Sequence, residues 1–140
     1  MEVERPLGYW LKHLDRLIEA AFDRVLAEAG LGRRHWQVLN CLRSSARTEE
    51  EIVEALRPFW GPGAIPVDEV LGELVRRGWV AGDGAGRHAL TQDGAAGHTA
   101  IQEKVNAIRA ATASGLTEED YQRTIATLRR MAENLESVAS

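Results

Sequence analysis

Residues 66–78 constrain the fold more than any other part of the sequence. Pro66 suits the first turn of a helix, where its missing N–H costs nothing, and Gly78 suits a C-terminal cap. Between them the apolar residues recur every three or four positions, a spacing that predicts an amphipathic helix with one buried stripe. The stripe consists of Val67, Val70, Leu71, Leu74 and Val75.

Two strand-like segments follow this helix, residues 79–82 and 87–91, and a glycine-rich turn joins them. Two short helices are expected before it, at residues 33–45 and 49–56. Helix, helix, helix and hairpin is the order of a winged helix-turn-helix, whose third helix enters the major groove of DNA. The sequence therefore predicts a mainly α fold with a small β-hairpin wing.

The second short helix opens with a capping box, in which Thr48 is followed three residues later by Glu51. A loop rich in proline and glycine then spans residues 57–65. Phe59 and Trp60 lie inside this loop, and we expect both side chains to pack against the core.

Long helices are expected on both sides of this lobe, at residues 7–29 and 92–114, with a last one that Thr117 caps and that runs to about residue 137. Their apolar stripes are longer than the lobe can cover, and a helix of this length needs a partner. A two-fold homodimer is the commonest solution, with a monomeric bundle as the alternative. We therefore expect a single domain, with a DNA-binding lobe at 33–91 and dimerisation helices at 7–29 and 92–137.

The amino-acid composition is that of an ordinary soluble protein, with 44% hydrophobic and 27% charged residues. The apolar runs are too short to span a membrane, and the acidic residues 1–6 do not resemble a signal peptide. Cys41 is the only cysteine, so no internal disulfide is possible, which fits a cytoplasmic protein. The net charge of −4 weighs against nucleic-acid binding without excluding it, since local patches decide phosphate contacts.

Catalytic and metal-binding patterns are not found in the sequence. The four histidines are scattered, and no cysteine or histidine pair has metal-ligand spacing. The glycines at 84 and 86 do not form a phosphate loop, because no lysine and no helix follow them. Cys41 lies on an apolar helix face and is interpreted as structural. We expect no enzyme activity, no cofactor and no metal.

Five segments, taken together and in order, resemble the MarR family of bacterial transcriptional regulators. They are residues 33–39, 48–52, 74–80, 90–94 and 116–121. The resemblance covers about residues 7–135 and implies a homodimer that reads palindromic double-stranded DNA. It also implies, for many members, a small aromatic ligand bound between the dimerisation helices and the DNA-binding lobe.

The expected DNA-binding residues combine basic and acidic side chains. The basic set is Arg33, Arg34, Arg76, Arg77, Arg87 and His88, and the outward face of the third helix presents Asp68, Glu69, Gly72 and Glu73. For Arg33 and Arg34, simple solvation is the alternative to phosphate contact. The carboxylates and the bare wing tip at residues 84–86 depart from the family pattern. Carboxylates accept from cytosine N4, yet phosphates repel them, so the rival hypothesis is a winged-helix dimer that has lost DNA reading.

A candidate effector site combines aromatic walls with a polar group. Its residues are Trp10, His13, Leu14 and Trp36, which come from the first two expected helices. Packing in the core or in a dimer interface is the more frequent use of such residues and remains the alternative.

Overall fold

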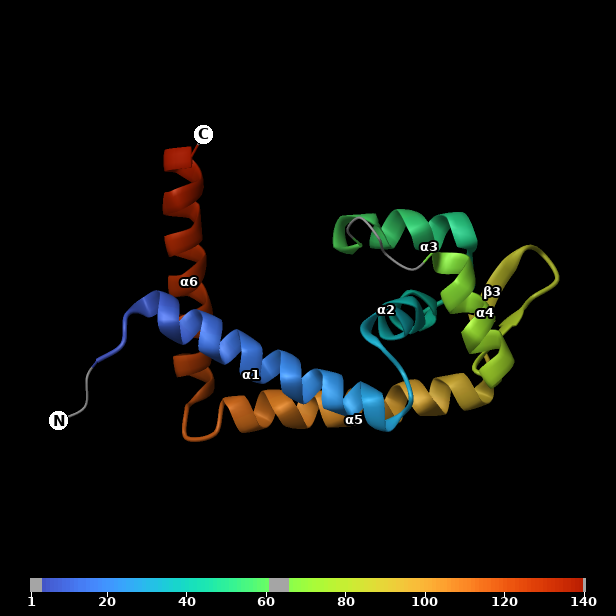
Figure 1. The fold of residues 1–140 in the computed structure, drawn as a ribbon, viewed down its shortest axis with the longest axis horizontal. Helices are drawn as coiled ribbons and strands as arrows, with labels where there is room; N and C mark the ends of the chain where they lie inside the picture. The colour runs from blue at the N-terminus through green and yellow to red at the C-terminus, as the bar shows by residue number, and fades with distance from the viewer. Residues whose placement is uncertain (1–3, 61–65, 140) are drawn as a thin grey trace. The chain divides into compact units, whose positions relative to one another are not determined.

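The computed structural model describes residues 4–60 and 66–139 of the chain (Figure 1). It divides into two compact units, Met1–Val105 and Asn106–Ser140. In chain order the elements are α1 (Leu7–Glu28), α2 (Arg33–Leu42), β1 (Arg47–Thr48), α3 (Glu49–Leu56), the 3-10 helix η1 (Arg57–Phe59), α4 (Val67–Arg77), β2 (Val80–Gly82), β3 (Arg87–Leu90), α5 (Gln92–Thr112) and α6 (Glu118–Ala139). This order confirms the predicted mainly α fold with a winged helix-turn-helix core and flanking helices.

Local capping signals explain where several helices begin and end. At α3, the Thr48 hydroxyl accepts from the Glu51 N–H at 3.1 Å, and the Glu51 carboxylate accepts from the Thr48 N–H at 2.9 Å. These bonds lower the pKa of Glu51, since they favour its charged form. Pro66 precedes the first residue of α4 as its cap, and Gly78 ends it with φ +86°.

The wing is part of a three-stranded antiparallel sheet with the order β1-β3-β2. The predicted hairpin is β2–β3, in which Val80 pairs with Leu90 and Gly82 with His88. β1 was not predicted, because a strand of two residues has no alternation to detect. β1 adds to the outer edge of β3 and ties the wing to the start of α3.

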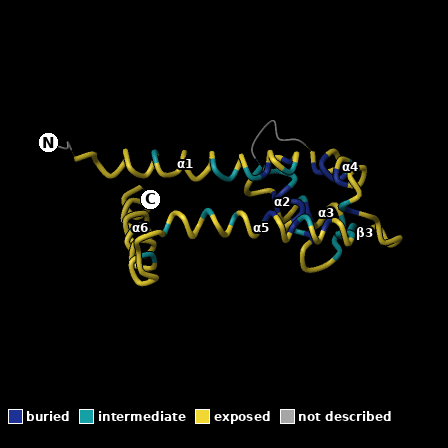
Figure 2. Tube along the Cα trace, turned by 90° about the horizontal axis from the view of Figure 1, so that it is seen from below, coloured by how far each residue is buried: buried dark blue, intermediate teal, exposed yellow. Residues whose placement is uncertain are grey.

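The core lies among α2, α3 and α4 and reaches the end of α1 and the start of α5, as the dark blue segments of Figure 2 show. Four of the five stripe residues of α4 are buried. The prediction for Val75 is wrong: it is 45% exposed, because it lies one residue past Leu74, beyond the edge of the buried stripe.

Two further expectations around the core are corrected. α2 ends at Leu42 rather than at residue 45, because the Arg47 guanidinium donates to the Cys41 carbonyl at 2.9 Å and satisfies the helix end. Phe59 is 70% exposed rather than packed, whereas Trp60 packs against the core and donates to Gln37 at 2.7 Å. The remainder of the predicted loop, residues 61–65, and residues 1–3 lie outside the described part of the chain.

Candidate nucleic-acid interface

Helix α4 presents the predicted acidic face to solvent. Burial of its apolar stripe fixes the rotation of the helix, and Asp68, Glu69 and Glu73 are left exposed, with Gly72 half-buried between them. Asp68 and Glu69 lie in the first turn, where the helix dipole favours negative charge. The carboxylates thus stabilise the helix that a winged helix protein uses to read DNA.

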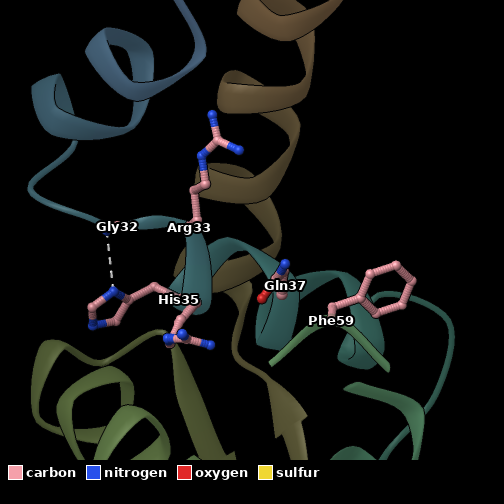
Figure 3. A pocket seen from close by; sticks show the side chains of 6 residues that line it. Gly32, Arg33, His35, Gln37 and Phe59 are labelled. Carbon is pink, nitrogen blue, oxygen red and sulfur yellow. Dashed lines mark hydrogen bonds between the residues drawn. The ribbon is translucent and has the colours of Figure 1, made fainter. Parts of the chain in front are cut away.

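Glu73 is held by a histidine of α2. The His35 Nε2 atom contacts the Glu73 carboxylate, and the His35 Nδ1 atom accepts from the Gly32 N–H at 3.1 Å (Figure 3). Because Nδ1 is an acceptor, the ring proton lies on Nε2 and is donated to Glu73. His35 therefore caps α2 and at the same time binds the last carboxylate of α4, that of Glu73.

Arg33 and His35 leave the start of α2 in different directions (Figure 3). Arg33 turns to α1, where it pairs with Asp23 at 2.8 Å and with Glu19 at 3.4 Å. The guanidinium of Arg34 lies 4.7 Å from the ring centre of Trp60. Arg33 therefore joins two helices, and Arg34 supports a core-facing tryptophan. Together with neighbouring residues, both arginines line an open pocket of about 440 Å³.

Arg76 and Arg77 are adjacent in sequence but have different surroundings. Arg76 is exposed, and its guanidinium lies over the outward face of α4, where a Cβ on Gly72 would come within 3.4 Å of it. Arg77 turns to the C-terminal end of α1 and donates to the carbonyl groups of Ala29 and Gly30. Of these two predicted DNA contacts, only Arg76 points its charge along the reading face.

The wing tip is a closed turn built on one carboxylate. Asp83 accepts from the Ala85 N–H at 2.8 Å and from the Arg87 N–H at 3.2 Å, and it pairs with the Arg87 guanidinium at 2.8 Å. The backbone hydrogen bond from Ala85 is the main cause that lowers the pKa of Asp83. Arg87 is half-exposed, and exposed pairs of this kind are weak, so the guanidinium can exchange Asp83 for a phosphate.

His88 has a place in the sheet rather than on the wing surface. It lies in β3 between Arg47 of β1 and Gly82 of β2, and it is half-buried. Its Nδ1 atom is buried and has no hydrogen-bond partner among the described residues. The structure therefore places His88 where it supports the wing.

The four candidate effector residues do not come together within the chain. Trp36 is buried against Phe22, with ring centres 6.5 Å apart. Trp10 lies twelve residues before Phe22 on the same helix, about 18 Å away along its axis. His13 stacks on Tyr9 instead, with ring centres 5.4 Å apart, and Leu14 is 46% exposed.

A buried histidine that no sequence pattern distinguished joins α2 to α5. His98 is 3% exposed, stacks on Trp36 with ring centres 4.6 Å apart, and shares a hydrogen bond of 2.6 Å with the Asn40 amide oxygen. Burial lowers the pKa of His98, and the positive charge of Arg43 lowers it further. The side chain is therefore neutral at pH 7, and only a three-dimensional structure could distinguish it from the other histidines.

Titration of His98 predicts that the fold loses stability in weak acid. Its pKa in the folded chain lies below the unfolded value of 6.5, so the unfolded chain binds more protons as the pH falls through 6.5 and then through the folded-state pKa. We expect the thermal unfolding midpoint to fall over this range and the fall to be shallower in His98→Gln. His13→Gln is the control, and an equal pH dependence in both variants would contradict the prediction.

The Cys41 thiol, the potential metal ligands and the apolarity of the helices are three further properties of the described residues. Burial raises the pKa of the Cys41 thiol, which makes the thiolate unfavourable and agrees with a structural role. No cluster of three or more potential metal ligands occurs among residues 4–60 and 66–139. Within the same residues, no helix has the length and apolarity that crossing a membrane requires.

Comparison with known proteins identifies the lobe. The family model of a winged helix DNA-binding domain matches residues 31–94, which include α2, α3, α4 and the wing. No curated protein matches the chain.

Solved structures extend the match over nearly the whole chain. The MarR family protein Rv2887 of Mycobacterium tuberculosis, in complex with DNA, is 22% identical, with 91% of this chain and 98% of that chain covered and a TM-score of 0.69. MepR, a transcription regulator of the Staphylococcus aureus multidrug efflux pump MepA, is 19% identical, with 94% and 99% covered and a TM-score of 0.73. A MarR family regulator from Rhodococcus sp. RHA1 is 19% identical, with 92% and 98% covered and a TM-score of 0.63.

The lobe and its outward helix form a winged helix-turn-helix, the fold of the winged helix DNA-binding domain whose model the lobe matches. The fold of the chain is that of the MarR-family regulators among these structures, and the match covers more than nine-tenths of the chain. This confirms, at the level of the fold, the resemblance that the sequence motifs indicated.

Proposed function

We propose that the protein is a transcriptional regulator that binds palindromic double-stranded DNA as a homodimer in the bacterial cytoplasm. The observation that carries this proposal is the winged helix lobe itself, with α4 packed on its apolar stripe and its polar face turned outward. The DNA complex of Rv2887, a protein of the same fold, supports the same use of this lobe. A two-fold dimer would present two α4 helices to adjacent major grooves, which matches a palindromic site.

The apolar side chains left exposed on the flanking helices support the dimer. On α1 and α6 these are Leu7, Tyr9, Trp10, Leu11, Leu14, Leu17, Ile18, Ile125, Met131, Leu135 and Val138. Monomeric proteins seldom leave so many large apolar groups in solvent, and a second copy is the commonest cover. We expect sedimentation at micromolar concentration to give a dimer, and a species of 15.4 kDa alone would contradict this.

DNA binding is tested by fluorescence anisotropy across a salt series. Because Arg87 is the half-exposed cation of the wing, Arg87→Ala should weaken binding to duplex DNA and reduce the salt slope by about one unit. Arg123→Ala is a matched control, since Arg123 forms a similar exposed pair with Glu119 on α6. Equal effects of the two substitutions would show that Arg87 has no place in the interface.

The rival function, a winged-helix dimer that has lost DNA reading, is favoured by the carboxylates Asp68 and Glu69. It would be supported if the wild-type protein bound no duplex even at low salt and the neutralised α4 variant described in the Discussion gained no binding.

An effector site is a second proposal, and a pocket of about 270 Å³ supports it better than the dispersed set around Trp10. α1, the Trp79 side chain and α5 form its walls, and a Glu28–Lys104 ion pair of 3.3 Å lies among the lining residues. Trp79 and Arg77 offer an aromatic face and a cation, which suit a small aromatic carboxylate. Quenching of tryptophan fluorescence by such a compound should be lost in Trp79→Phe and kept in Trp10→Phe.

A further inference from the structure

The link between α4 and β2 contacts both helices that flank the DNA-binding lobe. Arg77 is the last residue of α4, and its guanidinium donates to the carbonyl groups of Ala29 and, at 3.4 Å, of Gly30. These carbonyls lie at the C-terminal end of α1, whose own last turn carries no basic residue. A cation is favoured there by the helix dipole, and α4 supplies it.

Trp79 contacts both the Arg77 side chain and α5, and so connects α4 to α5. The Arg77 guanidinium lies 4.6 Å from the centre of the indole ring. That ring packs so closely on α5 that a Cβ at Gly97 would lie 2.4 Å from its nearest atom. The backbone is equally close, since the Trp79 carbonyl accepts from the Thr91 N–H at 3.0 Å and would lie 2.0 Å from a Cβ at Gly94.

We propose that Arg77 and Trp79 are positioning residues, which fix the direction of α4 relative to α1 and α5 and so set the half-site spacing that the dimer accepts. The inference rests on the proposed function, because spacing has meaning only for a dimer on DNA. In such a dimer each α4 is held at a distance from the two-fold axis by α1 and α5. A small rotation of the lobe at this link therefore changes the separation of the two reading helices, which must match the helical repeat of DNA.

The test compares two adjacent arginines on palindromic duplexes whose half-site spacing differs in steps of one base pair. Arg77→Gln removes the cation from the end of α1, while Arg76→Gln removes the same charge from the outward face and leaves this link intact. The wild-type protein and Arg76→Gln should prefer one spacing by about tenfold, since a wrong spacing must be met by deforming the DNA. Arg77→Gln should bind several spacings with similar affinity.

Trp79→Phe supplies a second variant, with smaller ring contact on Gly97, and it should flatten the spacing profile in the same way. Circular dichroism confirms that each variant is folded. A purely structural loss would lower the affinity for every duplex by the same factor and leave the preferred spacing unchanged. That result in both variants would overturn the positioning role while leaving DNA binding in place. If the wild-type protein bound none of the duplexes, the proposed function would fail as well.

Discussion

Replacing Gly94 by alanine is expected to cost about 3 kcal/mol of unfolding free energy, which is large for the addition of one methyl group. Gly94 is buried in the first turns of α5, and a Cβ there would lie 2.0 Å from the carbonyl oxygen of Trp79 and 2.8 Å from its carbonyl carbon. Both atoms belong to the backbone, so no side-chain rotation relieves the contact, and α5 must move away from the wing.

The matched control is Gly8→Ala on α1, where a Cβ would meet no atom within 4 Å. Alanine is the better helix former, so this substitution should leave the stability unchanged or raise it by up to about 1 kcal/mol. Chemical denaturation followed by circular dichroism gives both values. An unfolding free energy for Gly94→Ala equal to that of the wild-type protein would show that α5 and the wing do not pack as closely as described.

Neutralising the acidic first turn of α4 is expected to tighten binding to non-specific duplex DNA by about tenfold at low salt. Asp68 and Glu69 are exposed at the end of α4 that docking brings to the major groove. There they approach phosphates, which repel them, and they must also give up hydration. The double variant Asp68→Asn, Glu69→Gln removes both charges while keeping side-chain size.

The control for net charge is Glu133→Gln, Glu136→Gln on α6, which changes the charge equally and should alter binding much less. Anisotropy with the same duplex across a salt series measures all three proteins. A different outcome would be informative: if Asp68→Asn lost binding to one particular sequence, the carboxylate accepts from a cytosine amino group and determines specificity. Our expectation that it only limits affinity would then be wrong.

Local signals in the sequence predicted most of the fold. The apolar spacing of α4, the capping box of Thr48 and Glu51, and the glycine-rich turn of the wing all act over a few residues, and each was found where it was expected. What the sequence could not show was pairing over long separations. Arg77 reaches a carbonyl 47 residues away, and His98 reaches an amide 58 residues away.

Because pairing over long separations cannot be predicted from sequence, only some of the candidate DNA-binding residues have the surroundings that were expected. Arg33 and Arg77 were candidates for DNA contact, with solvation as the alternative for Arg33. The structure directs both toward α1 instead, one to carboxylates and one to carbonyl groups. Similarly, Glu73 was predicted to be outward, which is correct, but the histidine of α2 that binds it lies 38 residues earlier. Arg34 stacks on a tryptophan that local patterns placed in a loop.

The cation at the end of α1 has a consequence for how the protein unfolds. α1 has no basic residue of its own in the last turn, and the carbonyl groups of Ala29 and Gly30 just after it are bound by a side chain that is in place only when α4 is formed. Opening of the lobe therefore also releases the end of α1 from α4, and we expect the two regions to open together in hydrogen exchange. Amide protection at the end of α1 should therefore match that of α4. Opening of the DNA-binding lobe would then also loosen the end of the helix that joins the two subunits of the proposed dimer.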